Sequence, residues 1–205
     1  MLGKIAGILP AMKHCLTTLG AIVMCVTAVS AAPGPATKPS TAPAPPGIGE
    51  GAPDFILKSI DDKTIVLQEI NAAGPVVLVV LRGWVGYDCP ICTKQVAQLI
   101  AKKGQFADAK AKVLLIYPGP AENLKKHAQH FLQQPLPPNF ELVLDPDFKF
   151  TDGYHIRWNA PNETAYPSTF VVNQAGIIQL AKVSKSHGGR ATMREILGAL
   201  KEQQP

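Results

Sequence analysis

The sequence predicts an α/β domain in which a mixed central β-sheet is flanked by helices on both faces. One basis is a run of six aliphatic residues at 76–81, which is typical of a strand buried on both faces. Another is a helical spacing of apolar residues directly after that strand and again near the C-terminus. The third is a pair of segments, 54–60 and 64–70, that alternate apolar and polar residues around Asp61-Asp62. These segments predict an N-terminal β-hairpin.

The remaining elements follow from the same two periods. Cys92, Val96, Leu99 and Ile100 share one helical face, and Pro90 suits the first turn of that helix because its missing N–H costs nothing there. Two further helices are predicted at residues 124–132 and 193–200. Four further strands are predicted at residues 113–117, 140–144, 169–172 and 177–183. The resulting order is hairpin, β-α-β-α, a short strand, a strand pair and a final helix.

The N-terminal residues 1–31 have the composition of a signal peptide. Basic residues precede an apolar run that starts at Cys15, and small residues near Ala31 suit cleavage by a signal peptidase. An uncleaved membrane anchor is the alternative, since this run is at the lower end of the about 17–25 residues that span a bilayer. Residues 32–50 are rich in proline and alanine and predict an extended linker before the domain at 51–205. We therefore expect a periplasmic or secreted protein that contacts the membrane only if the N-terminal segment is retained.

Charge and repetition exclude other classes of protein. Lysine and arginine number 20 against 15 aspartates and glutamates, yet no run of basic residues reaches five. Such a balance indicates a mildly basic surface rather than a nucleic-acid interface. The sequence also lacks an internal repeat, which argues against solenoids and propellers.

The predicted domain contains two cysteines, Cys89 and Cys92, in the segment Cys-Pro-Ile-Cys. A disulfide between them closes too short a loop to stabilise a fold, because the entropic benefit grows with loop length. A zinc site needs two more ligands, and the histidines of the domain are scattered along the chain. The spacing therefore favours a redox dithiol over a metal site. We expect neither a resident metal nor a cofactor.

The dithiol is predicted to lie at the start of a helix that follows a strand. A thiol at such a place is activated as a nucleophile. Unpaired N–H groups and the partial positive charge of a helix N-terminus favour a thiolate and lower its pKa from about 8.5. Arg82, in the loop before the helix, is predicted to add a positive charge. The neighbouring cysteine can then attack a mixed disulfide or a sulfenic acid and close the Cys89–Cys92 disulfide.

Several segments resemble the alkyl hydroperoxide reductase/thiol-specific antioxidant family, a peroxiredoxin-like branch of the thioredoxin-fold superfamily. They are Gly51–Leu57, the approach Arg82-Gly83-Trp84, the cysteine motif itself, and Pro167–Val172 with the turn that follows. The resemblance implies a thioredoxin-like fold in which Pro167 is cis and packs beside the dithiol. It also implies a substrate site lined by Trp84, Tyr166 and Pro167.

The resemblance leaves the attacking thiol open. Peroxiredoxins typically have a threonine or serine three positions before the peroxide-reacting cysteine, whereas here Cys89 itself stands three positions before Cys92. One alignment makes Cys92 the peroxide-reacting residue, and the thioredoxin pattern makes Cys89 the exposed nucleophile. The arginine that holds peroxide in that family is replaced by Pro167, so Arg82 or Arg157 would have to substitute for it.

We expect an exported, thiol-dependent antioxidant enzyme that reduces peroxides through this dithiol and is recharged by a thiol reductant, which the sequence does not identify. The alternative is a thiol-disulfide oxidoreductase that acts on protein disulfides. A third hypothesis is a copper-handling module, in which His187 would join the two cysteines as a ligand of Cu(I).

Overall fold

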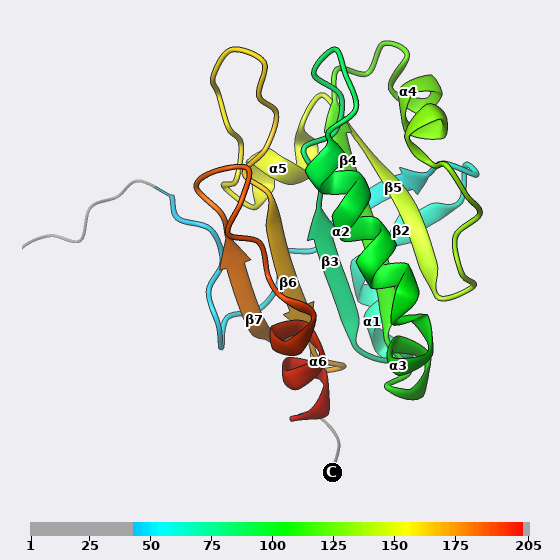
Figure 1. Ribbon diagram of the computed structural model, residues 1–205. Helices are drawn as coiled ribbons and strands as arrows, with labels where there is room; N and C mark the ends of the chain where they lie inside the picture. The colour runs from blue at the N-terminus through cyan, green and yellow to red at the C-terminus, as the bar shows by residue number, and fades with distance from the viewer. Residues whose placement is uncertain (1–42, 203–205) are drawn as a thin grey trace, which may run out of the picture. The chain divides into compact units, whose positions relative to one another are not determined.

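The computed structural model describes residues 43–202, so the predicted signal peptide and most of the predicted linker lie outside the described residues. Its seven-stranded sheet has the strand order β2-β1-β5-β4-β3-β6-β7 (Figure 1). The strands are β1 (Ile56–Ser59), β2 (Thr64–Val66), β3 (Val76–Val80), β4 (Lys112–Gly119), β5 (Phe140–Pro146), β6 (Ser168–Val172) and β7 (Ile178–Val183). Strands β3, β4 and β5 are parallel, and every other neighbouring pair is antiparallel. The predicted mixed sheet is therefore confirmed.

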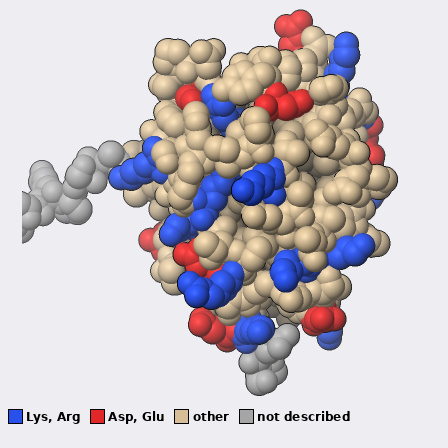
Figure 2. All heavy atoms as spheres, viewed as in Figure 1, with Lys and Arg blue, Asp and Glu red and all other residues tan. Residues whose placement is uncertain are grey.

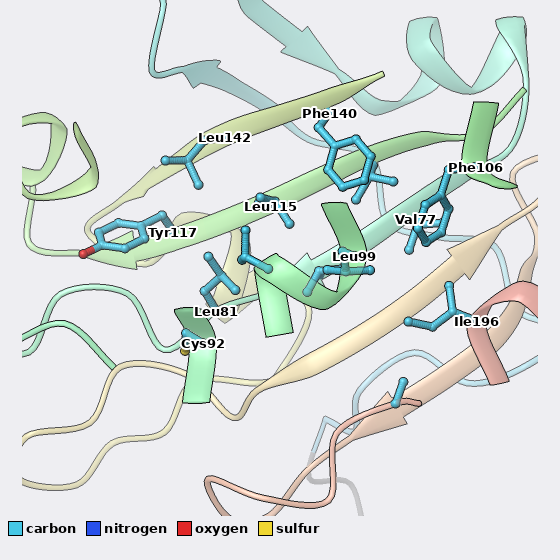
Figure 3. Packing of buried hydrophobic residues seen from close by; sticks show 14 of the residues in the cluster. Val77, Leu81, Cys92, Leu99, Phe106, Leu115, Tyr117, Phe140, Leu142 and Ile196 are labelled. Atoms are coloured by element: carbon cyan, nitrogen blue, oxygen red, sulfur yellow. The ribbon is translucent and has the colours of Figure 1, made fainter. Parts of the chain in front are cut away.

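The helices cover both faces of this sheet. On the face with β3 side chains Val77 and Val79, the core includes residues of α2 (Pro90–Ala101), α3 (Lys103–Asp108), α4 (Leu124–Phe131) and α6 (Met193–Lys201). Figure 3 shows core side chains from α2, α3 and α6 on this face. On the face with Val76, Leu78 and Val80, it includes residues of α1 (Leu67–Ala73) and α5 (Lys149–Gly153). All five residues of β3 are fully buried, as the aliphatic run predicts.

The predicted hairpin is present but shorter than expected, because its second strand ends at Val66 and α1 begins at Leu67. Leu67 and Asn71 are the buried residues of α1, and their spacing of four places them on one helical face. The segment 67–73 is also rich in leucine, alanine, glutamine and glutamate, which are good helix formers. The prediction of a strand to residue 70 was therefore wrong.

The start of the described chain lies along β7. The Gly49 amide donates to the Ile178 carbonyl, the Ile178 amide donates to the Glu50 carbonyl, and the Ala52 amide donates to the Gly176 carbonyl, each at 2.9 Å. These bonds satisfy backbone groups at the edge of the sheet, where an unpaired strand would otherwise be open to another chain. Among residues 43–202, none of the helices combines the length and the apolar character needed to cross a bilayer.

Candidate active site

Strand β3 leads directly into the loop that carries the dithiol. Helix α2 begins at Pro90, with Cys89 as its N-cap and Cys92 in the first turn. No acidic residue lies in that turn, so no carboxylate there offsets the partial positive charge of the helix N-terminus. The sequence-predicted arrangement of strand, loop and cysteine-bearing helix is therefore present.

A glycine allows this loop to pass close to the end of β4. Gly83 has a φ of +69°, and a Cβ at this position would overlap the carbonyl oxygen of Pro118. The next residue, Trp84, donates its amide to the same oxygen at 3.0 Å. The absence of a side chain at Gly83 allows the loop to lie directly against β4. This contact fixes the start of α2 relative to the sheet.

Both cysteines are free thiols and both are buried, with 4% of Cys89 and 1% of Cys92 exposed. The Cys92 Sγ accepts a hydrogen bond from the Arg82 backbone amide at 3.4 Å and another from the Arg190 guanidinium Nη2 at 3.3 Å. These donors lie far apart in the sequence, one before α2 and the other before α6. Together they fix the position of the Cys92 sulfur.

The two thiols differ sharply in acidity. A hydrogen bond from the Cys92 thiol lowers the pKa of Cys89 to about 5, against the opposing effect of burial. Backbone N–H groups of Cys92 and Ile91 and the charge of Arg190 contribute to the same lowering. The pKa of Cys92 is raised, because its thiol donates to Cys89 and because it is buried. The hydrogen bond between the two thiols therefore favours the thiolate form of Cys89 over that of Cys92.

The structure corrects the role expected of Arg82. Its guanidinium forms two hydrogen bonds to the Glu163 carboxylate, at 2.9 and 3.1 Å, and also donates to the Tyr87 hydroxyl and the Asn162 carbonyl. Only 4% of the Arg82 side chain and 10% of the Glu163 side chain are exposed. The charge of Arg82 is thus neutralised by Glu163, and its backbone amide, rather than its guanidinium, contacts Cys92.

The positive charge at the dithiol comes from Arg190, which precedes α6. Besides Cys92 Sγ, its guanidinium donates to the side-chain carbonyl of Gln95 and to the backbone carbonyl of His187. Sequence reasoning did not place Arg190 in the site. The signal that could have found it is its position after two glycines, in the loop that precedes the last helix.

The three predicted substrate-contacting residues have different surroundings. Trp84 stacks on His127 of α4, with ring centroids 3.6 Å apart, and Tyr166 stacks on Trp158 at 4.8 Å. Pro167 is buried next to the end of β3, because the following residue, Ser168, pairs with Val80. Of the three, Pro167 is the one that the sheet register places beside the start of the dithiol loop.

The expected cis form of Pro167 is wrong, since the described residues contain no cis peptide bond. The trans form of a proline peptide bond is favoured by about 0.5–1 kcal/mol. Here the backbone on both sides of this bond is also satisfied. The Tyr166 amide donates to the Ile156 carbonyl at 2.8 Å, and the Pro167 carbonyl accepts from the Ser184 amide at 3.0 Å.

His187, the third ligand of the copper hypothesis, lies with its ring against Glu163 and Trp158. Its Nε2 is 2.8 Å from Glu163 Oε1, and its ring is 5.2 Å from that of Trp158. Within residues 43–202, no group of three or more histidine, cysteine, aspartate or glutamate side chains is placed to hold a metal ion. The donor geometry therefore does not support a copper site built from Cys89, Cys92 and His187.

Comparison with known proteins identifies similar sequences and a similar fold. The chain is similar to thiol-disulfide oxidoreductase ResA of Bacillus subtilis (27% identical over 128 residues) and of Halalkalibacterium halodurans (24% over 144 residues). The matches cover 62% and 70% of this chain and 63% and 70% of the relatives, so the first spans less than two thirds of its relative's length. The fold is similar to that of peroxidoxin BcpB from Mycobacterium tuberculosis, with a TM-score of 0.61, 18% identity, and coverage of 77% of this chain and 98% of that one.

The thioredoxin-like fold expected from the sequence is therefore confirmed. The model of the AhpC/TSA family matches residues 48–181, which include the dithiol, the loop before β6 and most of β7. This match spans well over half of the sequence, and the chain therefore belongs to the AhpC/TSA family.

Proposed function

We propose that the protein is a thiol-disulfide oxidoreductase that cycles Cys89 and Cys92 between a dithiol and a disulfide. The observation that carries this proposal is the asymmetry of the pair. Cys89 caps the N-terminus of α2 and has a pKa of about 5, whereas Cys92 is the more buried thiol and donates a hydrogen bond to it. A thiolate with a neighbouring thiol one helical turn away is what disulfide exchange requires.

In the proposed reaction the Cys89 thiolate attacks one sulfur of a substrate disulfide. A bond forms between Cys89 Sγ and that sulfur, the substrate S–S bond breaks, and the other substrate sulfur leaves with the electron pair. Cys92 then attacks Cys89 Sγ, the mixed disulfide breaks, and the proton lost by Cys92 is taken up by the released substrate thiolate. The substrate gains two electrons, and Cys89 and Cys92 become a disulfide.

The surface around Cys89 supports a protein or peptide disulfide as the substrate. Tyr87 and Ile91 flank the cysteine in sequence and are exposed by 49% and 43%, although the Tyr87 ring and the Ile91 side chain are large and apolar. Apolar side chains beside a nucleophile offer contact area to a polypeptide, which a small peroxide does not need. The ResA relatives are also named as thiol-disulfide oxidoreductases.

Peroxide reduction is the second candidate function, and two hydrogen bonds favour it. Cys92 Sγ accepts hydrogen bonds from a backbone amide and from the Arg190 guanidinium, a setting that would stabilise a thiolate at Cys92 if it lost its proton. In that case Cys92 would attack the peroxide, become a sulfenic acid, and be resolved by Cys89 with release of water.

The rates of oxidation by two oxidants separate these functions. The reduced protein is mixed with a peptide disulfide or with hydrogen peroxide, and oxidation is followed by the fluorescence of Trp84 and Trp158. We expect fast reaction with the disulfide and a reaction with peroxide no faster than that of free cysteine. Cys89→Ser should abolish the first reaction, and Cys92→Ser should trap the substrate on Cys89. Fast peroxide reaction that persists in Cys89→Ser would instead support the second candidate.

Export to the periplasm or the cell exterior is part of this proposal and is supported by the basic and apolar N-terminal sequence. In such an oxidising compartment the disulfide formed by the reaction must be reduced again by a thiol reductant. Fractionation of cells combined with N-terminal sequencing tests this. We expect a chain that begins near residue 32, whereas a full-length chain in the membrane fraction would indicate a retained anchor.

A further inference from the structure

The guanidinium of Arg190 is held in place by three hydrogen bonds from three different donor nitrogens. Nε donates to the His187 carbonyl at 3.1 Å, Nη1 to the Gln95 side-chain carbonyl, and Nη2 to Cys92 Sγ at 3.3 Å. Gln95 is itself buried, with 6% of its surface exposed, and lies on α2 one turn after Cys92. One helix therefore carries both the sulfur and the amide that fixes the arginine against it.

The charge of Arg190 is not neutralised by a carboxylate. None of the ion pairs among residues 43–202 includes it, and its two side-chain partners are an amide and a sulfur. The groove beside it, between α2 and the start of α6, is lined by Lys94 and Lys102 and by no acidic residue. Figure 2 shows basic side chains across the middle of this face, with acidic ones mainly toward its edges.

We propose that Arg190 is a catalytic residue of the second half-reaction, in which it stabilises the thiolate of Cys92. This inference rests on the proposed dithiol cycle and adds the group that makes its second step fast. As long as Cys89 is a thiolate, the Cys92 thiol donates a hydrogen bond to it. Once Cys89 is part of a mixed disulfide it no longer carries that charge, and Arg190 is the cation in contact with Cys92 Sγ.

The same contact acts in both directions of the cycle. During resolution Cys92 loses its proton, attacks Cys89 Sγ and forms the intramolecular disulfide, while the substrate sulfur leaves and takes up a proton. During reduction an external thiolate attacks Cys89, and Cys92 leaves as a thiolate. In each direction negative charge develops on Cys92 Sγ, 3.3 Å from a guanidinium held there beforehand.

The groups that face Cys92 determine how this step depends on pH. Cys89 contacts it within α2, Arg190 contacts it from the loop before α6, and Tyr117 of β4 lies close enough to interact with it electrostatically. Tyr117 is protonated at neutral pH, since burial raises its pKa. Arg190 is therefore the charged side chain against Cys92 after Cys89 has reacted.

A neutral aromatic disulfide, dithiodipyridine, allows the rates of the two half-reactions to be measured separately. One equivalent is mixed with the reduced protein, and each attack releases a coloured thiopyridone, first by Cys89 and then by Cys92. In Arg190→Met we expect the second release to be about tenfold slower at pH 7, which corresponds to a rise of about one unit in the pKa of Cys92. The first release should be unchanged, because Cys89 remains ionised at that pH. The pH profile of the second release should move upward by the same amount.

Two variants control for charge and for folding. Arg194→Met removes an exposed arginine four residues further along and should leave both releases unchanged. Arg190→Lys should restore part of the second rate. If Arg190→Met does not fold, Gln95→Ala loosens the guanidinium without removing it and should slow the same release by a smaller factor.

The possible outcomes distinguish this inference from the proposed function. A wild-type protein that releases only one thiopyridone would overturn the dithiol cycle itself. Two normal releases in the wild type, together with an unchanged second rate and pH profile in folded Arg190→Met, would overturn the role of Arg190 alone. Equal slowing by Arg194→Met would likewise assign the effect to overall charge rather than to the contact with Cys92.

Discussion

Arg82 and Arg190 both contact Cys92, but they do so with different atoms and in different electrostatic states. Arg82 contributes a backbone amide, and its guanidinium is neutralised by the buried carboxylate of Glu163. Arg190 contributes the guanidinium itself, held by an amide. A cation that is already paired stabilises the fold but has little charge left for a nearby anion. The comparison shows that the partner of an arginine, rather than its distance in sequence from the cysteines, decides what it does at the site.

The largest difference between the two arginines should appear in stability. Arg82→Met leaves Glu163 buried without its main partner and should lower the free energy of unfolding by about 3–5 kcal/mol. Arg190→Met should lower it by only about 1 kcal/mol, because it loses hydrogen bonds at a half-buried site without isolating a charge. Urea unfolding of the reduced proteins measures both. In the double variant Arg82→Met/Glu163→Leu much of the loss should be recovered, and equal losses in the two single variants would contradict the comparison.

The second difference concerns the acidity of Cys89. The rate of alkylation by iodoacetamide should fall off in the wild type only near pH 5, where the Cys89 thiolate is protonated. Cys92→Ala removes the hydrogen bond that lowers the pKa of Cys89 most, so the midpoint should rise toward that of an ordinary thiol. Arg190→Met should raise it less, and Arg82→Met should leave it unchanged. A rise in Arg82→Met comparable to that in Arg190→Met would show that both guanidinium charges act on the sulfur.

The same pKa determines how stability depends on pH. The pKa of Cys89 is about 5 in the folded protein and about 8.5 in an unfolded chain. The thiolate therefore stabilises the reduced fold fully above the unfolded value, and this contribution is lost as the pH falls through the folded value. The oxidised protein has no such thiolate. The free energy of unfolding of the reduced form, measured relative to that of the oxidised form by urea unfolding, should consequently fall between neutral pH and pH 5.

A further prediction concerns the segment that holds Arg190. Thr192, two residues later, is the N-cap of α6 and forms a capping box, in which the Thr192 hydroxyl accepts from the Glu195 amide and the Glu195 carboxylate accepts from the Thr192 amide. Thr192→Ala should cost about 1 kcal/mol of unfolding free energy. Because the cap fixes the end of the Arg190 loop, the second thiopyridone release should slow by less than in Arg190→Met. An unchanged release would show that the contacts with Gln95 and His187 suffice to hold the guanidinium.

The elements that define the dithiol could be predicted from the sequence because each has a local signal. The aliphatic run at 76–81 predicts β3, and the apolar spacing after Cys92 predicts α2. The helices α3 and α5 have no such signal, because six and five residues are too few to show a helical period. Pro167 was placed correctly at the start of β6, but nothing local in the sequence determines the form of its peptide bond.

The side chains that surround the sulfurs could not be predicted in the same way. Glu163 is 81 residues from Arg82, and Arg190 is 98 residues from Cys92. These pairs form because β6 lies antiparallel to β3, which brings the segment before β6 and the loop after β7 to the end of β3. A pairing of this kind is a property of the sheet. In the sequence alone, Arg82 is the arginine nearest to the cysteine motif. The sequence therefore predicts for Arg82 the role that Arg190 has in the structure.

The smallest effect is expected for His187, the second partner of Glu163. Its ring nitrogen lies 2.8 Å from Glu163 Oε1, but 40% of its side chain is exposed, so solvent weakens the contact. His187→Gln should lower the free energy of unfolding by less than about 1 kcal/mol and leave both thiopyridone releases unchanged, since Arg82 still neutralises Glu163. His130→Gln, which alters a more exposed histidine paired with Asp88, is the matched control. A loss in His187→Gln as large as that in Arg82→Met would mean that Glu163 depends on the histidine as much as on the arginine, and the buried pair would then be a triad.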